Sequence, residues 1–320
     1  MATTTETALT DAEIAKIREQ ALTVIETEGL NRTAAAREAG IAQATFLAWL
    51  NNTYEGRNDN VASRVQIWLS SRTERRRAAA ALPQAPIYVP TQTASRIHEV
   101  LQWAMIGPDI VVVAGAAGVG KTTACQQFAG VNPHVWVATM TPEMASVHRM
   151  MGAIANAVGV TERNAARITD VCGAKMSGTG GLLIVDEAQH LRAPALDTLR
   201  ALHDLYGIGI ALVGNESVYG RLEGGEGRRP EFAQLYSRVG MRFTRSKPYG
   251  QDVCALIQAW GVTDEAAIKL LKSIAAKPGA LRGMTKCLRL ASMLAKGAGE
   301  ALGEKHVTAA WARLSDTGAA

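Results

Sequence analysis

Eight consecutive residues constrain this chain more than any other feature. Gly115 to Thr122 read GAAGVGKT and match the phosphate-binding pattern GxxxxGK[ST] in full. An apolar run precedes the pattern, and a helical stretch, Thr123 to Phe128, follows it. Glycines let backbone N–H groups turn towards phosphate oxygens, and the helix N-terminus adds partial positive charge. The sequence therefore predicts a nucleotide-binding loop between a strand and a helix.

Short apolar runs alternate with helical patterns through the middle of the chain. They are β-branched or aliphatic through most of their length, which is typical of parallel strands buried on both faces. We therefore expect an α/β core with a parallel five-stranded sheet and flanking helices. Its predicted strands are Ile110–Ala114, Val135–Thr139, Leu182–Val185, Ile208–Val213 and Met241–Thr244.

Two acids, Asp186 and Glu187, end the third of these runs. Parallel strands place such residues at the carboxyl edge of the sheet, beside the nucleotide loop. Asp186 and the Thr122 hydroxyl are expected to hold Mg²⁺, and Glu187 is expected to polarise the water that attacks the γ-phosphate. The residues expected to bind ATP are Gly115, Ala116, Ala117, Gly118, Val119, Gly120, Lys121, Thr122, Thr123 and Asp186.

Asn215 follows the fourth run. Its amide can orient the attacking water or touch the γ-phosphate, or it can simply cap the next helix. The neighbouring motifs favour the first interpretation.

Two arginines are candidates for stabilising the transferred phosphoryl group. Arg238 precedes the last predicted strand, and Arg282 begins a helix in the C-terminal block. Guanidinium groups match the charge that spreads over the γ-oxygens, so one arginine can act within the subunit and another from a neighbour. The alternative for each is a surface or ion-paired arginine. Arg242 and Arg228 compete for the neighbour role.

Together these motifs resemble those of the AAA+ ATPases. The resemblance assigns Lys121 and Thr122 to Walker A and Asp186 and Glu187 to Walker B. It also makes Asn215 sensor 1, Arg238 the arginine finger and Arg282 sensor 2. It further implies ring-shaped or helical homo-oligomers, because the finger acts on the neighbouring subunit.

The N-terminal block contains a second pattern. Arg32 to Leu50 fits a helix-turn-helix, with Ala36 where the helices cross and Gly40 in the tight turn. A three-helix bundle with a similar turn is the alternative. We expect weak or non-specific DNA binding, helped by Arg72 to Arg77. The side chains expected to face DNA are Gln43, Thr45 and Asn51.

The order of these blocks defines the expected domains. Residues 1–70 form the helix-turn-helix domain, and the basic, proline-rich stretch 71–93 is expected to be an extended connector. Residues 94–249 form the AAA+ core, and residues 250–320 form an all-α lid domain without strand signals.

This layout resembles the Mu-like transposition ATPase family over residues 10 to 314. The likeness implies ATP-dependent, non-specific binding to double-stranded DNA, helical filaments, and delivery of the DNA to a DDE-type transposase that stimulates hydrolysis. The family is strongly basic where this chain has only Arg163, Arg167 and Lys175 between 161 and 180. With Arg149, these are the DNA-contact candidates in the core. Points of likeness are Val89–Thr93, Val135–Trp136, Thr141–Pro142, Ile184–Ala188, Val213–Asn215, Glu231–Ala233, Ser237–Arg238 and Lys277–Arg282.

Other functions fit the sequence less well. A helicase loader or replication initiator shares every ATP motif and is the main alternative. A DExH helicase would need a second strand series, which the last 130 or so residues lack. A regulator that only senses ATP would not need Glu187, Asn215 and Arg238.

Composition adds further expectations. The net charge of +5 permits nucleic-acid binding without demonstrating it. The polar N-terminus shows no secretory signal, and no apolar run is long enough for a membrane helix, so we expect a protein of the bacterial host cytoplasm. The dispersed cysteines argue against a zinc site.

Overall fold

The computed structural model describes residues 9–81, 86, 88–218 and 237–315, with side chains between 77 and 81 excepted. The chain forms two compact units, Met1–Pro83 and Gln84–Ala320. Glu231 to Ala233 and Arg228, which the sequence analysis singled out, lie outside the described residues.

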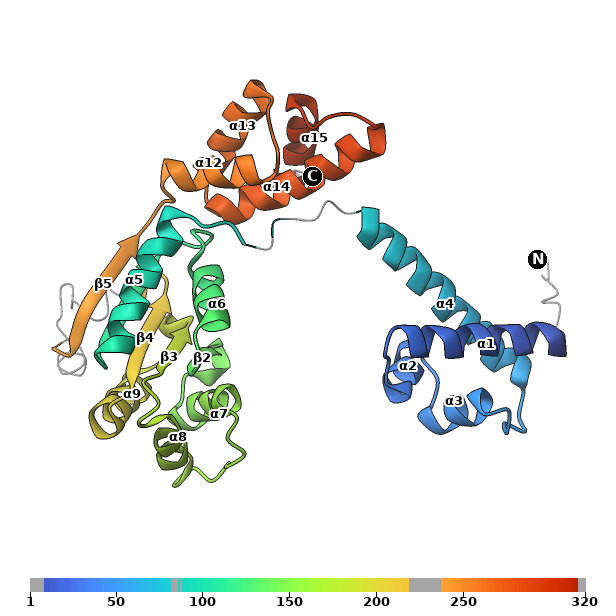
Figure 1. Ribbon diagram of the computed structural model, residues 1–320, viewed down its shortest axis with the longest axis horizontal. Helices are drawn as coiled ribbons and strands as arrows, with labels where there is room; N and C mark the ends of the chain where they lie inside the picture. Colours follow the sequence, from blue (N-terminus) through green and yellow to red (C-terminus); the bar gives the residue numbers. More distant parts are fainter. Residues whose placement is uncertain (1–8, 82–85, 87, 219–236, 316–320) are drawn as a thin grey trace, which may run out of the picture. The chain divides into compact units, whose positions relative to one another are not determined.

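The N-terminal unit is helical: α1 (Asp11–Thr27), α2 (Arg32–Glu38), α3 (Gln43–Leu50) and α4 (Asn58–Ala81) (Figure 1). Asn31 caps α2 by accepting a hydrogen bond from the Thr33 N–H at 2.9 Å. Gly40, with φ +66°, lies in the turn between α2 and α3. Phe46 and Trp49 of α3 are fully buried against the other helices. The segment therefore consists of two short helices joined by a glycine turn, and its assignment as a helix-turn-helix stays a prediction.

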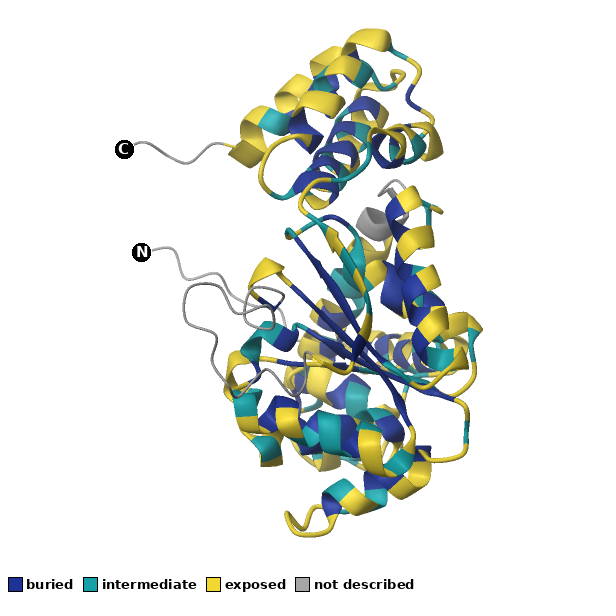
Figure 2. Cartoon of the chain, turned by 90° about the vertical axis from the view of Figure 1, so that its left-hand side faces the viewer, coloured by how far each residue is buried: buried dark blue, intermediate teal, exposed yellow. Residues whose placement is uncertain are grey.

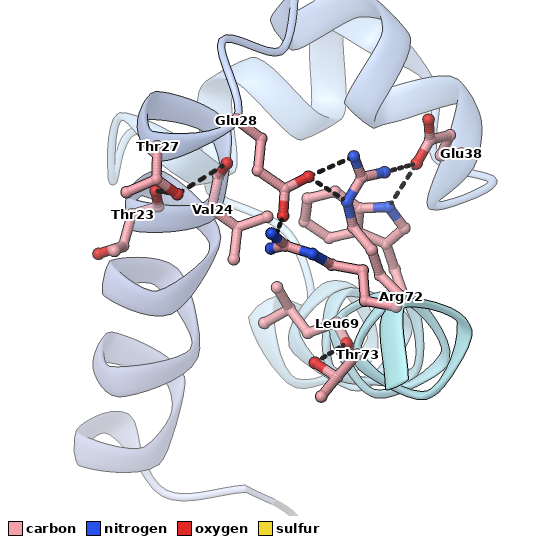
Figure 3. Close-up of polar contacts among 10 residues, drawn as sticks. Thr23, Val24, Thr27, Glu28, Glu38, Leu69, Arg72 and Thr73 are labelled. Atoms are coloured by element: carbon pink, nitrogen blue, oxygen red, sulfur yellow. Dashed lines mark hydrogen bonds and ion pairs between the residues drawn. The ribbon is translucent and has the colours of Figure 1, made fainter. Parts of the chain in front are cut away.

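Helix α4 corrects the predicted connector, because it continues through the arginine and alanine runs to Ala81. Alanine and arginine are strong helix formers, and distant acids hold the arginines in place. Arg72 donates to Glu28 at 2.8 Å and also to Glu38, and Arg76 contacts Glu28 (Figure 3). The Trp68 indole N–H donates to Glu38 as well, and this bond lowers the pKa of that carboxyl. Only the stretch up to Thr91 is left as a link between α4 and the next helix.

The second unit contains the parallel five-stranded sheet that the sequence predicts. Its strands are β1 (Ile110–Gly115), β2 (Val135–Thr139), β3 (Leu182–Asp186), β4 (Gly209–Gly214) and β5 (Val239–Arg245), in the order β2-β3-β4-β1-β5. Every residue of β1, β3 and β4 is buried, whereas β5 alternates along the sheet edge. The continuous apolar runs are therefore the inner strands, as expected.

Helices cover both faces of this sheet, whose buried strands appear dark blue in Figure 2. Helices α5 (Gln92–Ile106) and α6 (Lys121–Val131) pack on one face. Helices α7 (Val147–Val158), α8 (Ile168–Met176) and α9 (Ala193–Tyr206) pack on the other. Two 3₁₀ turns, η1 (Pro142–Met144) and η2 (Ala188–His190), complete the core.

The C-terminal block is a small helical domain, as predicted, and has its own core. It comprises α12 (Gly250–Ala259), α13 (Glu265–Ala275), α14 (Ala280–Ala298) and α15 (Glu304–Ser315). We call these four helices the lid. Asp252 of α12 joins it to the ATPase core, because its buried carboxylate accepts hydrogen bonds from the backbone N–H groups of Gln92 and Thr93 at the start of α5.

Two further findings bear on function. Among the described residues, no helix is long and apolar enough to cross a membrane. Cys125, Cys172 and Cys287 are buried thiols and Cys254 is an exposed one, and within the described ranges no three His, Cys, Asp or Glu side chains gather as a metal site.

Candidate functional site

The strand order explains why distant motifs meet. Strands β3, β4 and β1 are adjacent and parallel, so the residues that follow them emerge at one edge of the sheet. A pocket of about 640 Å³ lies there, between the core and the lid. The predicted residues that line it are Gly118, Gly120, Lys121, Thr122, Thr123, Ala117, Glu187, Asn215 and Arg282.

The phosphate loop is shaped by glycines in the left-handed region. Gly120, with φ +100°, caps the N-terminus of α6 and so presents that helix end to the pocket. The Lys121 ammonium donates to the carbonyls of Gly115 at 2.8 Å and Ala116 at 3.0 Å. Burial lowers the pKa of Lys121, and the nearby charges of Glu187 and Asp186 oppose that shift. The lysine is thus held at the loop, facing two acids.

Thr122 and Asp186 lie side by side, as the sequence predicts. The Thr122 hydroxyl donates to the Asp186 carboxylate at 2.8 Å. Burial raises the pKa of Asp186, and the bond from Thr122 partly offsets this. A hydroxyl and a carboxylate are the hard oxygen donors that Mg²⁺ takes when nucleotide phosphates and water supply its remaining ligands. The pair therefore fits the metal that the motif implies.

Glu187 lines the pocket directly after Asp186, with its backbone in the left-handed region at φ +56°. Its carboxylate accepts a hydrogen bond from the side-chain amide of Gln189. Gln189 is not among the predicted site residues, although it lies two residues after Glu187 in the run from Asp186 to His190 that resembles a DExH motif.

Asn215 makes the capping contacts that one of its two interpretations predicts. Its side-chain oxygen accepts from the Ser217 N–H at 3.0 Å and from the Ser217 hydroxyl at 2.6 Å, so it caps the short turn that follows. It also lines the pocket at the end of β4. A role at the γ-phosphate remains a prediction.

The lid closes over the phosphate loop by a contact between two glycines. A Cβ at Gly118 would lie 2.0 Å from the Gly279 carbonyl oxygen, so only glycine permits this approach. Arg282 is the third residue of α14, and its Cβ would lie 3.3 Å from a Cβ at Gly118; its side chain lines the pocket. The lid therefore places Arg282 beside the phosphate loop.

The far end of the pocket was not predicted. Tyr88 and Val89 from the link, with Leu256 of α12 and Trp260 directly after that helix, form an apolar wall. Burial raises the pKa of Tyr88. Cationic side chains of α14 complete the lining, spaced one and two turns after Arg282, and these are Lys286 and Arg289. An apolar wall with polar groups beside it suits a nucleoside.

Arg238 lies away from this pocket. It precedes β5, whose first residue pairs with Ile110 at the start of β1, whereas the phosphate loop follows the end of β1. Its guanidinium Nε donates to Asp204 at 2.7 Å, and this bond lowers the pKa of Asp204. Arg238 therefore lies near the amino ends of the strands, whereas the phosphate loop of its own chain lies at their carboxyl ends. Arg242 is exposed in the middle of β5.

The predicted DNA contacts fall into two groups. In the N-terminal unit, Gln43 is exposed and Thr45 is half-buried, while Asn51 is the exposed cap that ends α3. Asn51 therefore lies directly after the last residue of the second helix.

Two of the four DNA-contact candidates in the core donate hydrogen bonds to backbone carbonyls of their own chain. Arg163 donates to the carbonyls of Val160 and Glu162, and Lys175 donates to that of Gly159. Arg149 and Arg167 remain largely exposed.

Comparison with known proteins places these features in a family. Residues 106–222 match the model described as an AAA domain, and residues 237–314 match that of the Mu B transposition protein, C terminal. The chain is 37% identical over 303 residues to the ATP-dependent target DNA activator B of Escherichia phage Mu, covering 94% of this chain and 96% of that protein.

Two further similarities agree. A Mu-like prophage FluMu DNA transposition protein B of Haemophilus influenzae is 37% identical over 254 residues, covering 78% of this chain and 88% of that protein. A Walker-type ATPase of Pyrococcus abyssi superposes with a TM-score of 0.51 at 11% identity, over 72% of this chain and 76% of that chain, and shows a shared fold.

Proposed function

The chain belongs to the Mu B transposition protein family and is an AAA-type ATPase, and from this membership we propose that it binds target DNA with ATP and activates a transposase. The relatives are named target DNA activators. The observation that carries the proposal is the pocket that joins Lys121, Thr122, Glu187 and the lid's Arg282 in a chain similar to these relatives almost end to end.

Hydrolysis follows from the positions of these side chains. The loop N–H groups and Lys121 bind the β- and γ-phosphates. Thr122 and Asp186 would hold Mg²⁺, which supplies charge neutralisation on the phosphate oxygens. Glu187 accepts a proton from water as the water oxygen bonds to the γ-phosphorus, and the bond to the β-phosphate oxygen breaks to release ADP. Arg282 adds positive charge from the lid.

Arg238 supports a proposal of assembly. Because it lies at the opposite edge of the sheet from its own phosphate loop, it can reach a γ-phosphate only in another subunit. We infer that subunits stack so that Arg238 of one meets the nucleotide of the next. A helical filament on DNA is the form of this stacking that the family resemblance implies.

Assembly also accounts for DNA binding by a chain whose candidate DNA contacts are few and dispersed. A single subunit with few phosphate contacts binds duplex DNA weakly, because affinity grows with the number of phosphates contacted. Linked subunits multiply that weak binding. Candidate contacts are Gln43, Thr45 and Asn51 in the N-terminal unit, and Arg149 and Arg167 in the core. The partner is a DDE-type transposase, and the setting is the cytoplasm of a bacterial host.

The proposal is tested with purified protein, ATP and linear duplex DNA of arbitrary sequence. Electron microscopy and sedimentation across a salt series should show salt-sensitive filaments with ATP. Glu187→Gln should keep ATP binding and prolong the DNA-bound state. Lys121→Ala should lose ATP binding and, with it, DNA binding. Adding the cognate transposase should disassemble the filaments. Closed rings on single-stranded DNA, or complexes that form only with a replicative helicase, would instead identify a helicase loader.

A further inference from the structure

Gln189 occupies a position in the pocket that none of the predicted catalytic roles uses. It belongs to the 3₁₀ turn η2, which follows β3, and its side chain is half-buried where it lines the pocket. Its amide lies between Glu187 at the end of β3 and the backbone at the end of β4.

Both ends of this amide have partners of the correct polarity. The NH₂ group donates to the Glu187 carboxylate oxygen Oε2, and the carbonyl Oε1 accepts from the Asn215 N–H at 3.2 Å. A flipped amide would set its oxygen against the carboxylate and its NH₂ against an N–H donor, so only this orientation is stable. The amide orientation therefore follows from its surroundings.

The end of β4 is shaped to admit this side chain. A Cβ at Gly214 would lie 2.4 Å from the Gln189 Oε1 atom, closer than van der Waals contact permits. Gly214 therefore leaves the space that lets Gln189 reach the Asn215 N–H.

We propose that Gln189 is a positioning residue that aims the Glu187 carboxylate at the attacking water. The inference rests on the proposed role of Glu187 as the base. Glu187 has three side-chain torsions on a left-handed backbone, so its carboxylate needs a restraint to stay in one place. Gln189 holds Oε2, which leaves Oε1 to accept the proton of water. Through the same amide, the base is tied to the strand end that carries Asn215.

The test is the ATPase activity of the full chain with duplex DNA, measured as kcat and KM. Gln189→Met keeps the length of the side chain but can neither donate nor accept these bonds. It should lower kcat about 10- to 100-fold, because misplacing a catalytic group by about 1 Å costs on the order of 100-fold. KM for ATP should stay within about twofold, because the phosphate loop is untouched. Gln126→Met, at an exposed glutamine of α6, is the matched control and should leave both constants unchanged.

A double-mutant cycle shows whether Gln189 acts through Glu187. In the Glu187→Gln background, adding Gln189→Met should cause no further loss of kcat, because the group being aimed is already gone. An equal loss in both backgrounds, or a Gln189→Met enzyme with wild-type kcat, would overturn the inference. If Gln189→Met fails to fold, Gln189→Asn carries the test, because it keeps an uncharged amide but is one methylene too short to bond both Glu187 and the Asn215 N–H.

The two proposals fail differently. Wild-type hydrolysis by Glu187→Gln alone would refute the assignment of the base. Impaired Glu187→Gln together with unimpaired Gln189→Met would refute only the positioning role.

Discussion

Replacing Asp252 by asparagine should loosen the lid from the ATPase core. The Asp252 carboxylate is completely buried, and it accepts from the N–H groups of Gln92, Thr93 and Tyr249 and from the Thr93 hydroxyl. These donors lie at the first turns of α5 and α12, so the negative charge is stabilised by two helix N-termini rather than by a cation. A single carboxylate therefore joins the two domains.

The expected cost follows from these four bonds. An asparagine offers one accepting oxygen, which can keep the N–H groups of Gln92 and Thr93. Its NH₂ can donate to the Thr93 hydroxyl, but the Tyr249 N–H is left facing a donor. One lost bond to a charged group is worth about 1.5–3 kcal/mol, and the weakened bonds bring the total to roughly 3 kcal/mol. In a unit of this size, that corresponds to a fall in Tm of roughly 6–12 °C.

Differential scanning calorimetry and ATP titration measure the two consequences. Tm should fall as above, and KM for ATP should rise several-fold, because Thr91 caps α5 and also lines the pocket. Asp264→Asn is the control: Asp264 caps α13 at the surface and accepts from the N–H groups of Ala266 and Glu304, both in the lid, so it should shift Tm less and leave KM unchanged. An Asp252→Asn protein with wild-type Tm and KM would refute the argument that this carboxylate links the domains.

Three other predictions concern the interface, the loop and acid stability. Arg238→Ala should bind ATP yet hydrolyse it about 10³-fold more slowly. Mixing it with Lys121→Ala subunits should restore ATPase activity. If activity is not restored, Arg238 does not belong to an ATP site shared between two subunits. Gly118→Ala should lower Tm and ATP affinity much more than Gly261→Ala. Both glycines have positive φ, but only at Gly118 would the added Cβ collide with the lid, since a Cβ at Gly261 meets no described atom within 4 Å. Equal effects of the two variants in melting and binding assays would contradict the lid contact. Arg238 lowers the pKa of Asp204, so the ion pair stabilises the fold above the ordinary aspartate pKa, and this contribution disappears as pH falls through the lowered pKa. As a surface pair it is worth under about 1 kcal/mol. Arg238→Ala should therefore make the dependence of Tm on acid pH shallower.

The phosphate loop could be predicted because its signal is local. Glycines at Gly118 and Gly120 are needed where φ is positive, and the flanking strand and helix have their own periodic patterns. The parallel sheet was equally predictable, since strands buried on both faces must be continuously apolar. The location of Asp186 and Glu187 beside the phosphate loop could then be predicted, because a parallel sheet brings the carboxyl ends of its strands together on one side.

The connector illustrates where local signals mislead. The connector was predicted to be extended from residue 71, yet α4 continues through the arginine and alanine runs to Ala81, before the first proline, Pro83. Arg72 meets Glu28 and Glu38, which lie 44 and 34 residues earlier. No local pattern states which acids a run of arginines will reach.

The sequence by itself determined the ATP chemistry of this protein, because backbone conformation and strand burial are encoded within a few residues. Tertiary structure alone decided which groups support that chemistry. Asp252 meets Thr93 across 159 residues, and Gln189 meets Asn215 across 26. Arg238 lies far from its own phosphate loop because β5 runs parallel to β1 and Arg238 precedes the first residue of β5. Such partners depend on the path of the whole chain, since a hydrogen bond requires only that donor and acceptor meet in space.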